Sequence, residues 1–114
     1  MISDEKGRLM SLPVWVDFMR TDWERRVKLD LPGTRDDLRR WGIQLVDGMH
    51  LVLYTEDADA EGRIDDLVTV GTVRYDDDEG RWAAEIDWEK LGHVSELPPD
   101  EARRYRDGRP GLDP

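Results

Sequence analysis

The chain has 114 residues, the length of one ordinary domain and too short for two separate hydrophobic cores. Cysteine is absent, which excludes disulfides, thiolate metal sites and thiol nucleophiles. The net charge is −10, with 38% hydrophobic and 39% charged residues, so the five tryptophans must supply much of the apolar area that a core needs.

The negative charge is concentrated in one part of the sequence. Residues 43–102 carry 17 acidic and 4 basic side chains, whereas residues 1–42 carry 8 acidic and 9 basic ones. Such a surface repels nucleic-acid phosphates and attracts cations and basic proteins. Because no apolar run approaches the roughly 18 residues of a membrane span and no signal-peptide pattern is present, we expect a cytoplasmic protein without a membrane anchor.

The first third of the chain predicts two short strands. Residues 1–12 show no sustained hydrophobic period, and we expect a flexible leader there. Residues 14–19 are predicted to be a strand with Val14, Val16 and Phe18 on one face. Residues 26–31 alternate polar and apolar side chains, and Pro32-Gly33 ends this second run. The side chains predicted to face inward are Val14, Val16, Phe18, Val27, Leu29 and Leu31. We expect the two strands to pair as a hairpin.

A short helix is predicted near residues 35–41. Thr34 and Asp37 have the spacing of a capping box, Leu38 begins an apolar face, and Gly42 supplies the stop. The chain is then predicted to become extended again.

Three further strands are predicted to form an antiparallel meander. Asp47-Gly48 is a two-residue hairpin signal between residues 43–46 and 49–55. In residues 67–75 the apolar parity changes at Gly71, which predicts a β-bulge or bend at that glycine. The last strand alternates over Trp82, Ala84, Ile86 and Trp88.

Residues 93–114 are predicted to be a partly docked tail with a short helix near 100–105 and mobile last residues. The domain proper is then residues 13–92. The fold class that follows is mainly β (α+β), a small bent antiparallel sheet or partly open β-barrel with one short helix near 35–41 and a second helix at the C-terminal end.

The loop between residues 56 and 66 has the oxygen spacing of a cation site. Side-chain oxygens stand at its positions 1, 3, 5 and 9, a main-chain carbonyl at position 7, and Gly62 at the turn. The candidate metal ligands are Asp57, Asp59, Glu61, Arg63 and Asp65. The loop resembles the aspartate-rich calcium loops of EF-hands and β-hairpin calcium sites, which implies weak calcium binding, at about 10⁻⁴–10⁻³ M, because Val68 stands where the bidentate glutamate would be. The alternative is a solvated acidic hairpin. No other cofactor is expected.

A protein-binding surface is the leading functional hypothesis. The negative meander would attract a partner, a basic one by its charge, and exposed tryptophans would anchor it, since tryptophan and arginine are enriched at binding hot spots. The candidate partner-binding residues are Trp15, Trp23, Arg35, Arg39, Arg40, Asp76, Asp77 and Asp78.

Catalysis is not indicated. His50 and His93 have no metal-ligand partner at helical or strand spacing, and neither a phosphate-binding glycine loop nor a nucleophile elbow occurs. We therefore predict a non-enzymatic module without catalytic residues, and no deep polar cleft that gathers His50 with Asp87.

Two resemblances complete the sequence reading. Residues 25–54 pass through a strand, a short helix containing Leu38-Arg39-Arg40, and the turn at Asp47-Gly48, an order similar to the swapped-hairpin DNA-binding domains of the AbrB and antitoxin group. That resemblance implies a homodimeric DNA-binding regulator, although the acidic meander disfavours nucleic acid. The implied contacts are Arg25, Arg26, Arg35, Arg39 and Arg40.

The stretch from Val14 to Trp88 also resembles short acidic bacterial proteins of unassigned function. The residues that carry this likeness are Val14-Trp15-Val16-Asp17-Phe18, Gly33-Thr34, Tyr54-Thr55, Trp82 and Ile86-Asp87-Trp88. It implies no activity. Three hypotheses thus remain open: a protein-binding module with an acidic surface, a calcium-binding hairpin module, and a dimeric DNA-binding regulator.

Overall fold

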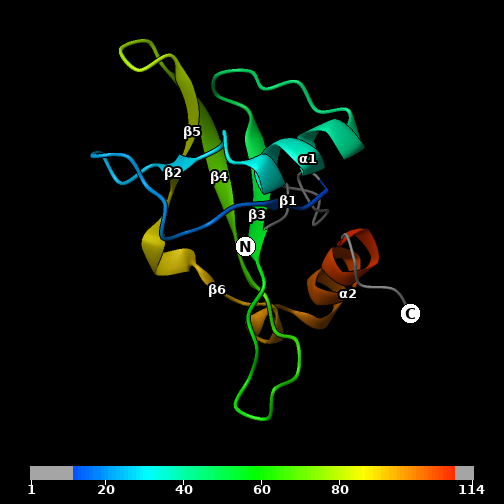
Figure 1. Cartoon of the computed structure of the whole chain (residues 1–114). Coiled ribbons are helices and arrows are strands. Elements are labelled where there is room, and N and C mark those ends of the chain that lie inside the picture. The colour runs from blue at the N-terminus through cyan, green and yellow to red at the C-terminus, as the bar shows by residue number, and fades with distance from the viewer. Residues whose placement is uncertain (1–11, 110–114) are drawn as a thin grey trace.

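Within residues 12–109, which the computed structural model describes, six strands form a half-barrel and two helices pack against it (Figure 1). The strands are β1 (Val14–Trp15), β2 (Val27–Lys28), β3 (His50–Thr55), β4 (Leu67–Asp76), β5 (Arg81–Ile86) and β6 (Gly92–His93). The helices are α1 (Pro32–Trp41) and α2 (Pro99–Gly108), and two 3-10 turns are η1 (Trp88–Lys90) and η2 (Val94–Glu96). The predicted α+β class with a bent sheet and a short helix near 35–41 is confirmed.

The sheet is mixed and not wholly antiparallel as predicted, because β1 pairs in parallel with β3. The strand order is β1-β3-β4-β5-β2, with β6 pairing with the start of β4. Residues 1–11 and 110–114, which hold most of the predicted leader and the end of the predicted tail, lie outside the described residues. No helix among residues 12–109 is long and apolar enough to cross a membrane.

The predicted hairpin of the first two strands is limited to its tip. An antiparallel bridge joins Thr21 to Val27, and the Lys28 N–H donates to the Arg20 carbonyl over 3.1 Å. Beyond this tip β1 and β2 lie apart. β1 pairs in parallel with β3 at one edge of the sheet, and β2 pairs with β5 at the other. The connection spans the open side of the half-barrel, and Phe18 is buried there.

The start of α1 differs from the prediction. The helix begins at Pro32, whose fixed φ suits the first helical position, and the Thr34 hydroxyl has no hydrogen-bond partner among the described residues. The Asp37 carboxylate does not complete a capping box. It accepts hydrogen bonds from the Trp15 main-chain N–H at 2.9 Å and from the Tyr54 hydroxyl at 3.3 Å, so it joins α1 to β1 and β3.

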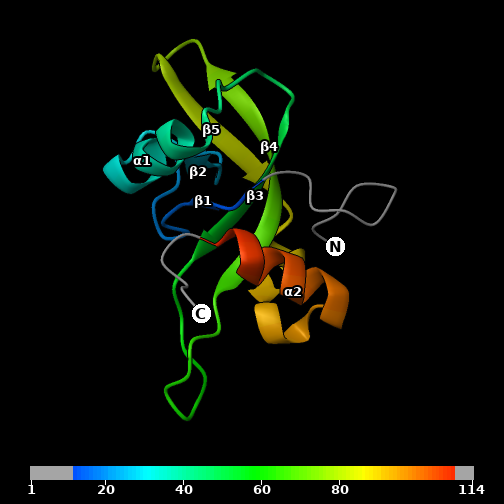
Figure 2. The ribbon, with the colours of Figure 1, turned by 90° about the vertical axis from the view of Figure 1, so that its right-hand side faces the viewer.

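Each face of the sheet carries its own core, and the two helices lie on opposite sides of the sheet (Figure 2). The inner core under α1 contains Val14, Val16, Phe18, Val27, Leu29, Leu38, Leu51, Leu53, Val73 and Ala84. The outer core under α2 contains Val52, Tyr54, Val68, Val94, Ala102 and Tyr105. The predicted inward side chains of the first two strands thus lie in one core, apart from Leu31, which is only partly buried.

The bulge predicted at Gly71 is wrong. Residue pairing runs one to one through this position, with Leu51 opposite on β3 and Ile86 opposite on β5. The apolar parity changes because β4 serves both cores in turn: Val68 faces the outer core and Val73 faces the inner one. A bulge is therefore not needed to explain the pattern.

The segment 43–46 is not a strand, which corrects a second prediction. A turn closes where the Met49 N–H donates to the Val46 carbonyl over 3.1 Å, with Gly48 at φ 90°. The turn does not join two paired strands. It contacts β4 instead, where the Asp47 carboxylate accepts a hydrogen bond from the Tyr75 N–H at 2.9 Å.

A buried ion pair fixes α2 on the outer face. The Asp66 residue, 1% exposed, accepts hydrogen bonds from the Tyr105 hydroxyl at 2.6 Å and from Nε of Arg109 at 2.8 Å. The Arg109 guanidinium also lies 4.8 Å from the centre of the Tyr54 ring, within cation–π range. The loop before β4 and the end of α2 are thereby held together across the sheet.

Replacing Gly71 by valine should destabilise the inner core. A Cβ at this position would lie 2.7 Å from Cδ1 of Leu53, 3.1 Å from Cβ of Ala84 and 3.2 Å from Cγ2 of Ile86. Overpacking of this kind costs about 1–3 kcal/mol, measured by urea denaturation. Thr72→Val, next along β4 on the outer face, is the control and should stay within about 0.5 kcal/mol. Equal stability of the two variants would contradict the close packing.

Removing the charge of Arg109 should destabilise the protein far more than removing that of an exposed arginine. Arg109→Met leaves the Asp66 carboxylate buried without its cation, at a cost of about 3–5 kcal/mol, and adding Asp66→Asn should recover part of the loss. Arg103→Met, on the same helix but in an exposed pair with Asp100, should cost under about 1 kcal/mol. Similar losses for both arginines would contradict this role for Arg109.

Candidate functional site

Trp23 is 83% exposed, yet the turn that carries it is tightly organised. The Asp22 carboxylate accepts hydrogen bonds from the main-chain N–H groups of Glu24 and Arg26, both at 2.9 Å, and pairs with Nε of Arg26 at 2.7 Å. The main chain of Arg25 has a left-handed φ of 63°, which residues other than glycine rarely adopt. Hydrogen bonds thus fix the main chain of the turn, and the indole is exposed on it.

Arg26 joins this turn to the turn between β4 and β5. Its guanidinium lies 3.3 Å from the Asp76 carboxylate, which also accepts the Asp78 N–H at 3.0 Å. Burial opposes the charged form of Asp22, but the hydrogen bonds and charge of Arg26 outweigh it and hold the pKa of Asp22 below its ordinary value. Asp76 therefore has a structural role, while Asp77 and Asp78 are exposed at the tip.

A small cavity of about 250 Å³ lies between the two turns and β5. The Trp82 ring forms one wall and meets Tyr75 edge-on at 4.8 Å. Lys28 and Arg81 also line this cavity. We call the following residues the Trp23 surface: Trp23, Trp82, Asp76, Asp77, Asp78 and Glu79. The structure therefore brings Trp23 together with Asp76 at this cavity, and Asp77 and Asp78 follow Asp76 in the same turn.

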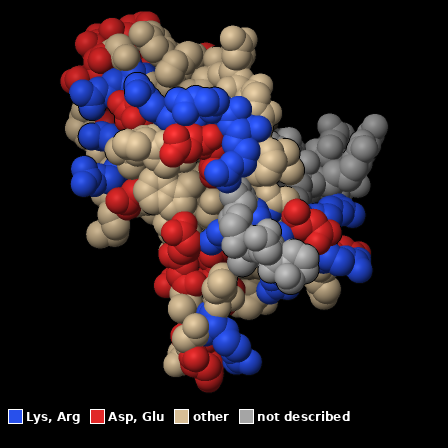
Figure 3. Space-filling model, turned by 45° about the vertical axis from the view of Figure 1, so that its right-hand side comes forward, with Lys and Arg blue, Asp and Glu red and all other residues tan. Residues whose placement is uncertain are grey.

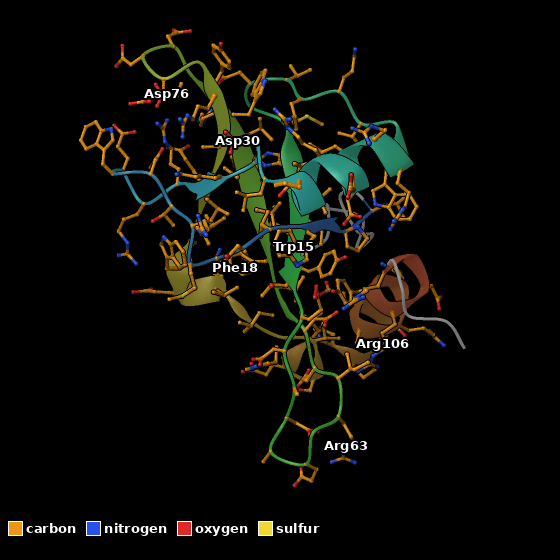
Figure 4. The ribbon with its side chains drawn as sticks, in the orientation of Figure 1. Trp15, Phe18, Asp30, Arg63, Asp76 and Arg106 are labelled. Atoms are coloured by element: carbon orange, nitrogen blue, oxygen red, sulfur yellow. The ribbon has the colours of Figure 1, made fainter. Side chains whose placement is uncertain are left out.

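The other predicted partner-binding residues lie elsewhere. Trp15 is half-buried against α1, where a Cβ on Gly33 would approach its ring to 2.7 Å, and Figure 4 shows it between α1 and β3, apart from Asp76. The arginines of α1 form an exposed band that is interrupted by carboxylates (Figure 3). Its members are Arg35, Arg39 and Arg40, of which Arg39 pairs with Asp36 and Arg40 with Asp37.

In the predicted calcium loop, the carboxylate at the turn has internal partners. Asp59 accepts hydrogen bonds from the main-chain N–H groups of Glu61 and Arg63 at 3.0 and 2.9 Å, and its second oxygen lies 3.1 Å from Nε of Arg63. The Arg63 guanidinium also pairs with the Glu61 carboxylate at 3.4 Å. Figure 4 shows Arg63 at the end of the molecule opposite Asp76.

The carboxylates at the base of the loop also have partners. Asp57 lies 2.8 Å from Nε2 of His93, and Asp65 accepts the Ser95 hydroxyl at 2.6 Å. Among the described residues, no group of three or more His, Asp or Glu side chains is arranged to hold a metal ion. Calcium binding at this loop stays a prediction, and it would require these contacts to be exchanged for the ion.

His93 links the loop to η2. Besides its contact with Asp57, its Nδ1 lies 3.5 Å from the Glu96 carboxylate, which accepts the His93 main-chain N–H at 2.8 Å. The hydrogen bond with Asp57 raises the pKa of the His93 imidazole above its ordinary value.

A groove of about 560 Å³ lies on the outer face of the sheet, and both His50 and Asp87 are in its lining, together with apolar residues such as Val70 and Leu97. Strand register is the reason, because His50, Thr72 and Glu85 lie opposite one another on three adjacent strands. Nδ1 of His50 is 3.3 Å from the Thr72 hydroxyl. Sequence analysis missed this row because nothing in the residues themselves fixes which strands are neighbours.

Comparison with known proteins gives no relative to guide these assignments. Protein-family models, curated proteins and solved structures were each searched, and none matches this chain. Functional arguments therefore rest on the contacts described above.

The raised pKa of His93 predicts a pH-dependent stability. A raised folded-state pKa stabilises the fold fully below the unfolded value near 6.5, and this contribution is lost as the pH rises through the folded value. The unfolding free energy of the wild type should thus fall from pH 6 upward relative to His93→Gln, in urea titrations across that range. His50→Gln serves as the control for losing an imidazole. A constant difference between wild type and His93→Gln would contradict the contact with Asp57.

Proposed function

We propose that this protein is a non-enzymatic module that binds a basic protein partner through the Trp23 surface. The observation that carries the proposal is the exposure of Trp23 in a turn that hydrogen bonds hold in place. Solvent exposure of a large indole forgoes the free energy of its burial, and tryptophan is the residue type most enriched at binding hot spots. A fixed turn also lowers the entropy lost when a partner covers the ring.

The connection between β1 and β2 exposes a second large apolar side chain, and a cavity lies beside Trp23. Met19, 89% exposed, belongs to the same connection between β1 and β2 as Trp23. The Trp82 ring lines the adjacent cavity, whose volume of about 250 Å³ suits a single side chain of a partner. An exposed indole beside a small cavity supports binding in which each partner inserts one anchor into the other.

The charges around Trp23 support a basic partner. The guanidinium of Arg26 is already shared among three carboxylates. Lys28 and Arg81 also line the cavity, and Arg81 lies 4.0 Å from the Glu79 carboxylate. The negative charge without an ion-pair partner among the described residues is therefore on Asp77 and Asp78, both exposed at the tip of the β4–β5 turn. On a protein of net charge −10, these groups would steer a cationic partner toward the indole.

The same geometry favours this proposal over the two other hypotheses. Carboxylates of the 57–65 loop already have partners, including Arg63 and His93. Of the arginines implied for DNA binding, Arg26 is enclosed in an ion-pair network and Arg25 lies 5.0 Å from the centre of the Trp88 ring. The α1 band alone would remain to contact phosphates.

A synthetic peptide of alternating lysine and leucine provides the test, with its glutamate–leucine counterpart as the acidic control. At low salt the basic peptide should bind, and its Kd should rise as salt is added, because exposed charges are screened. Trp23→Ala should weaken binding by about 2 kcal/mol, roughly thirtyfold in Kd. Fluorescence anisotropy of the labelled peptide is the measurement.

The matched control is Trp15→Phe, which changes a tryptophan outside the Trp23 surface and should leave the Kd within about threefold of the wild-type value. Equal binding of the acidic peptide, an affinity indifferent to salt, or wild-type affinity in Trp23→Ala would each overturn the proposal.

A further inference from the structure

The groove on the outer face is a second site, independent of the Trp23 surface. Among the described residues, the two hollows share no lining residue. The groove lies where α2 leaves the outer face of the sheet uncovered, and η1, β6 and η2 line its far side. We call it the outer-face groove. Its lining includes Val70, Leu97, Thr72, Glu85, Asp87 and Glu89.

An interruption of the sheet forms part of its floor. On this side of β4, pairing with β5 ends at Gly71 and pairing with β6 begins at Val68, so in the described chain Thr69 and Val70 have no partner strand there. The connecting chain leaves the sheet to form η1. Val70, only partly buried, is therefore open to the groove both at its side chain and along its main chain.

The floor of the groove is apolar. Val68 and Val70 of β4 and Leu97 after η2 belong to the outer core, but Val70 and Leu97 are partly exposed where α2 does not reach. Leu91 also contributes to the lining. A ligand with an aliphatic stem would gain roughly 25 cal/mol for each Å² of this apolar area that it removes from water.

The rim of the groove is negative. Among the lining residues, Lys90 is the one lysine or arginine, whereas four are carboxylates: Glu85, Asp87, Glu89 and Glu96. Two of these carboxylates already have a partner: Glu85 pairs with Arg74 at 2.8 Å, and Glu96 lies beside the His93 ring. Within the described residues, Asp87 and Glu89 form no ion pair, and Asp87 uses one oxygen to accept the Glu89 N–H at 3.1 Å.

We infer that the outer-face groove binds an aliphatic primary amine, its stem over Val70 and Leu97 and its ammonium group beside Asp87 and Glu89. The apolar floor favours a stem of methylene groups, and Asp87 and Glu89, both exposed and without an ion-pair partner among the described residues, attract a cation at the end of that stem. An anion would meet four carboxylates and is disfavoured. The amine is either a free alkylamine or a lysine side chain of another protein.

Four small probes separate the contributions. Pentylamine carries both stem and charge, pentanol the stem alone, ammonium the charge alone, and Nα-acetyl-lysine amide the side chain in a peptide setting. Titrations followed by amide chemical shifts should show pentylamine binding with shifts at Val70, Glu89 and Leu91. Pentanol and ammonium should each bind at least about tenfold more weakly.

The decisive variant is Asp87→Asn with Glu89→Gln. Asparagine still caps η1, so the backbone should be kept while the charge is lost, and pentylamine affinity should fall about tenfold. Asp36→Asn with Glu56→Gln, a pair of exposed carboxylates outside the groove, removes the same charge and should leave the affinity within about twofold.

The outcomes are distinct. Equal binding of pentylamine and acetyl-lysine amide supports a lysine side chain as the natural occupant, whereas exclusion of the amide supports a free amine. Pentanol binding as tightly as pentylamine, shifts confined to other surfaces, or an unchanged affinity in the groove variant would overturn the inference. Because the lysine–leucine peptide also carries primary amines, the two sites are separated by variant: Trp23→Ala should weaken binding of the peptide and leave that of pentylamine unchanged, whereas the groove variant should weaken binding of pentylamine and leave that of the peptide unchanged.

Discussion

Asp66 cannot be buried as a carboxylate unless a cation follows it into the outer core. Arg109 meets that requirement from 43 residues further along the chain, and the hydroxyl of Tyr105 adds a second donor. Isolated buried charges are among the costliest features a fold can carry, so α2 has one position in which the pair is complete. Because α2 covers only part of the outer face, the ion pair that positions it also influences where the groove begins.

Local patterns predicted which way side chains point better than they predicted which strands are neighbours. Val27, Leu53 and Val73 are fully buried, as alternation indicated, since a period of two fixes the face of a strand without reference to any other part of the chain. Strand order depends on contacts between distant residues. For that reason the parallel pairing of β1 with β3, set by the register of Val14 with Leu53, had no signal in the sequence.

The candidate sites show the same division. The exposure of Trp23 follows from its place in a turn, but its closeness to Asp76 depends on Arg26 and could not be inferred from sequence spacing. Asp37 is a case in which the local prediction failed. Its position suited a capping box, but its carboxylate accepts hydrogen bonds from β1 and β3 instead. Local propensity yields where a buried polar group from another element needs a partner.

The interruption between β5 and β6 also bears on aggregation. Unpaired strand edges invite other chains to add as extra strands, and proteins protect them by keeping them short or charged. Here the open stretch of β4 is confined to Thr69 and Val70, shorter than the three or more residues that a typical strand requires, and Asp87 and Glu89 lie beside it. A small molecule can reach this edge, while a neighbouring polypeptide has too little of it to extend the sheet into a fibre.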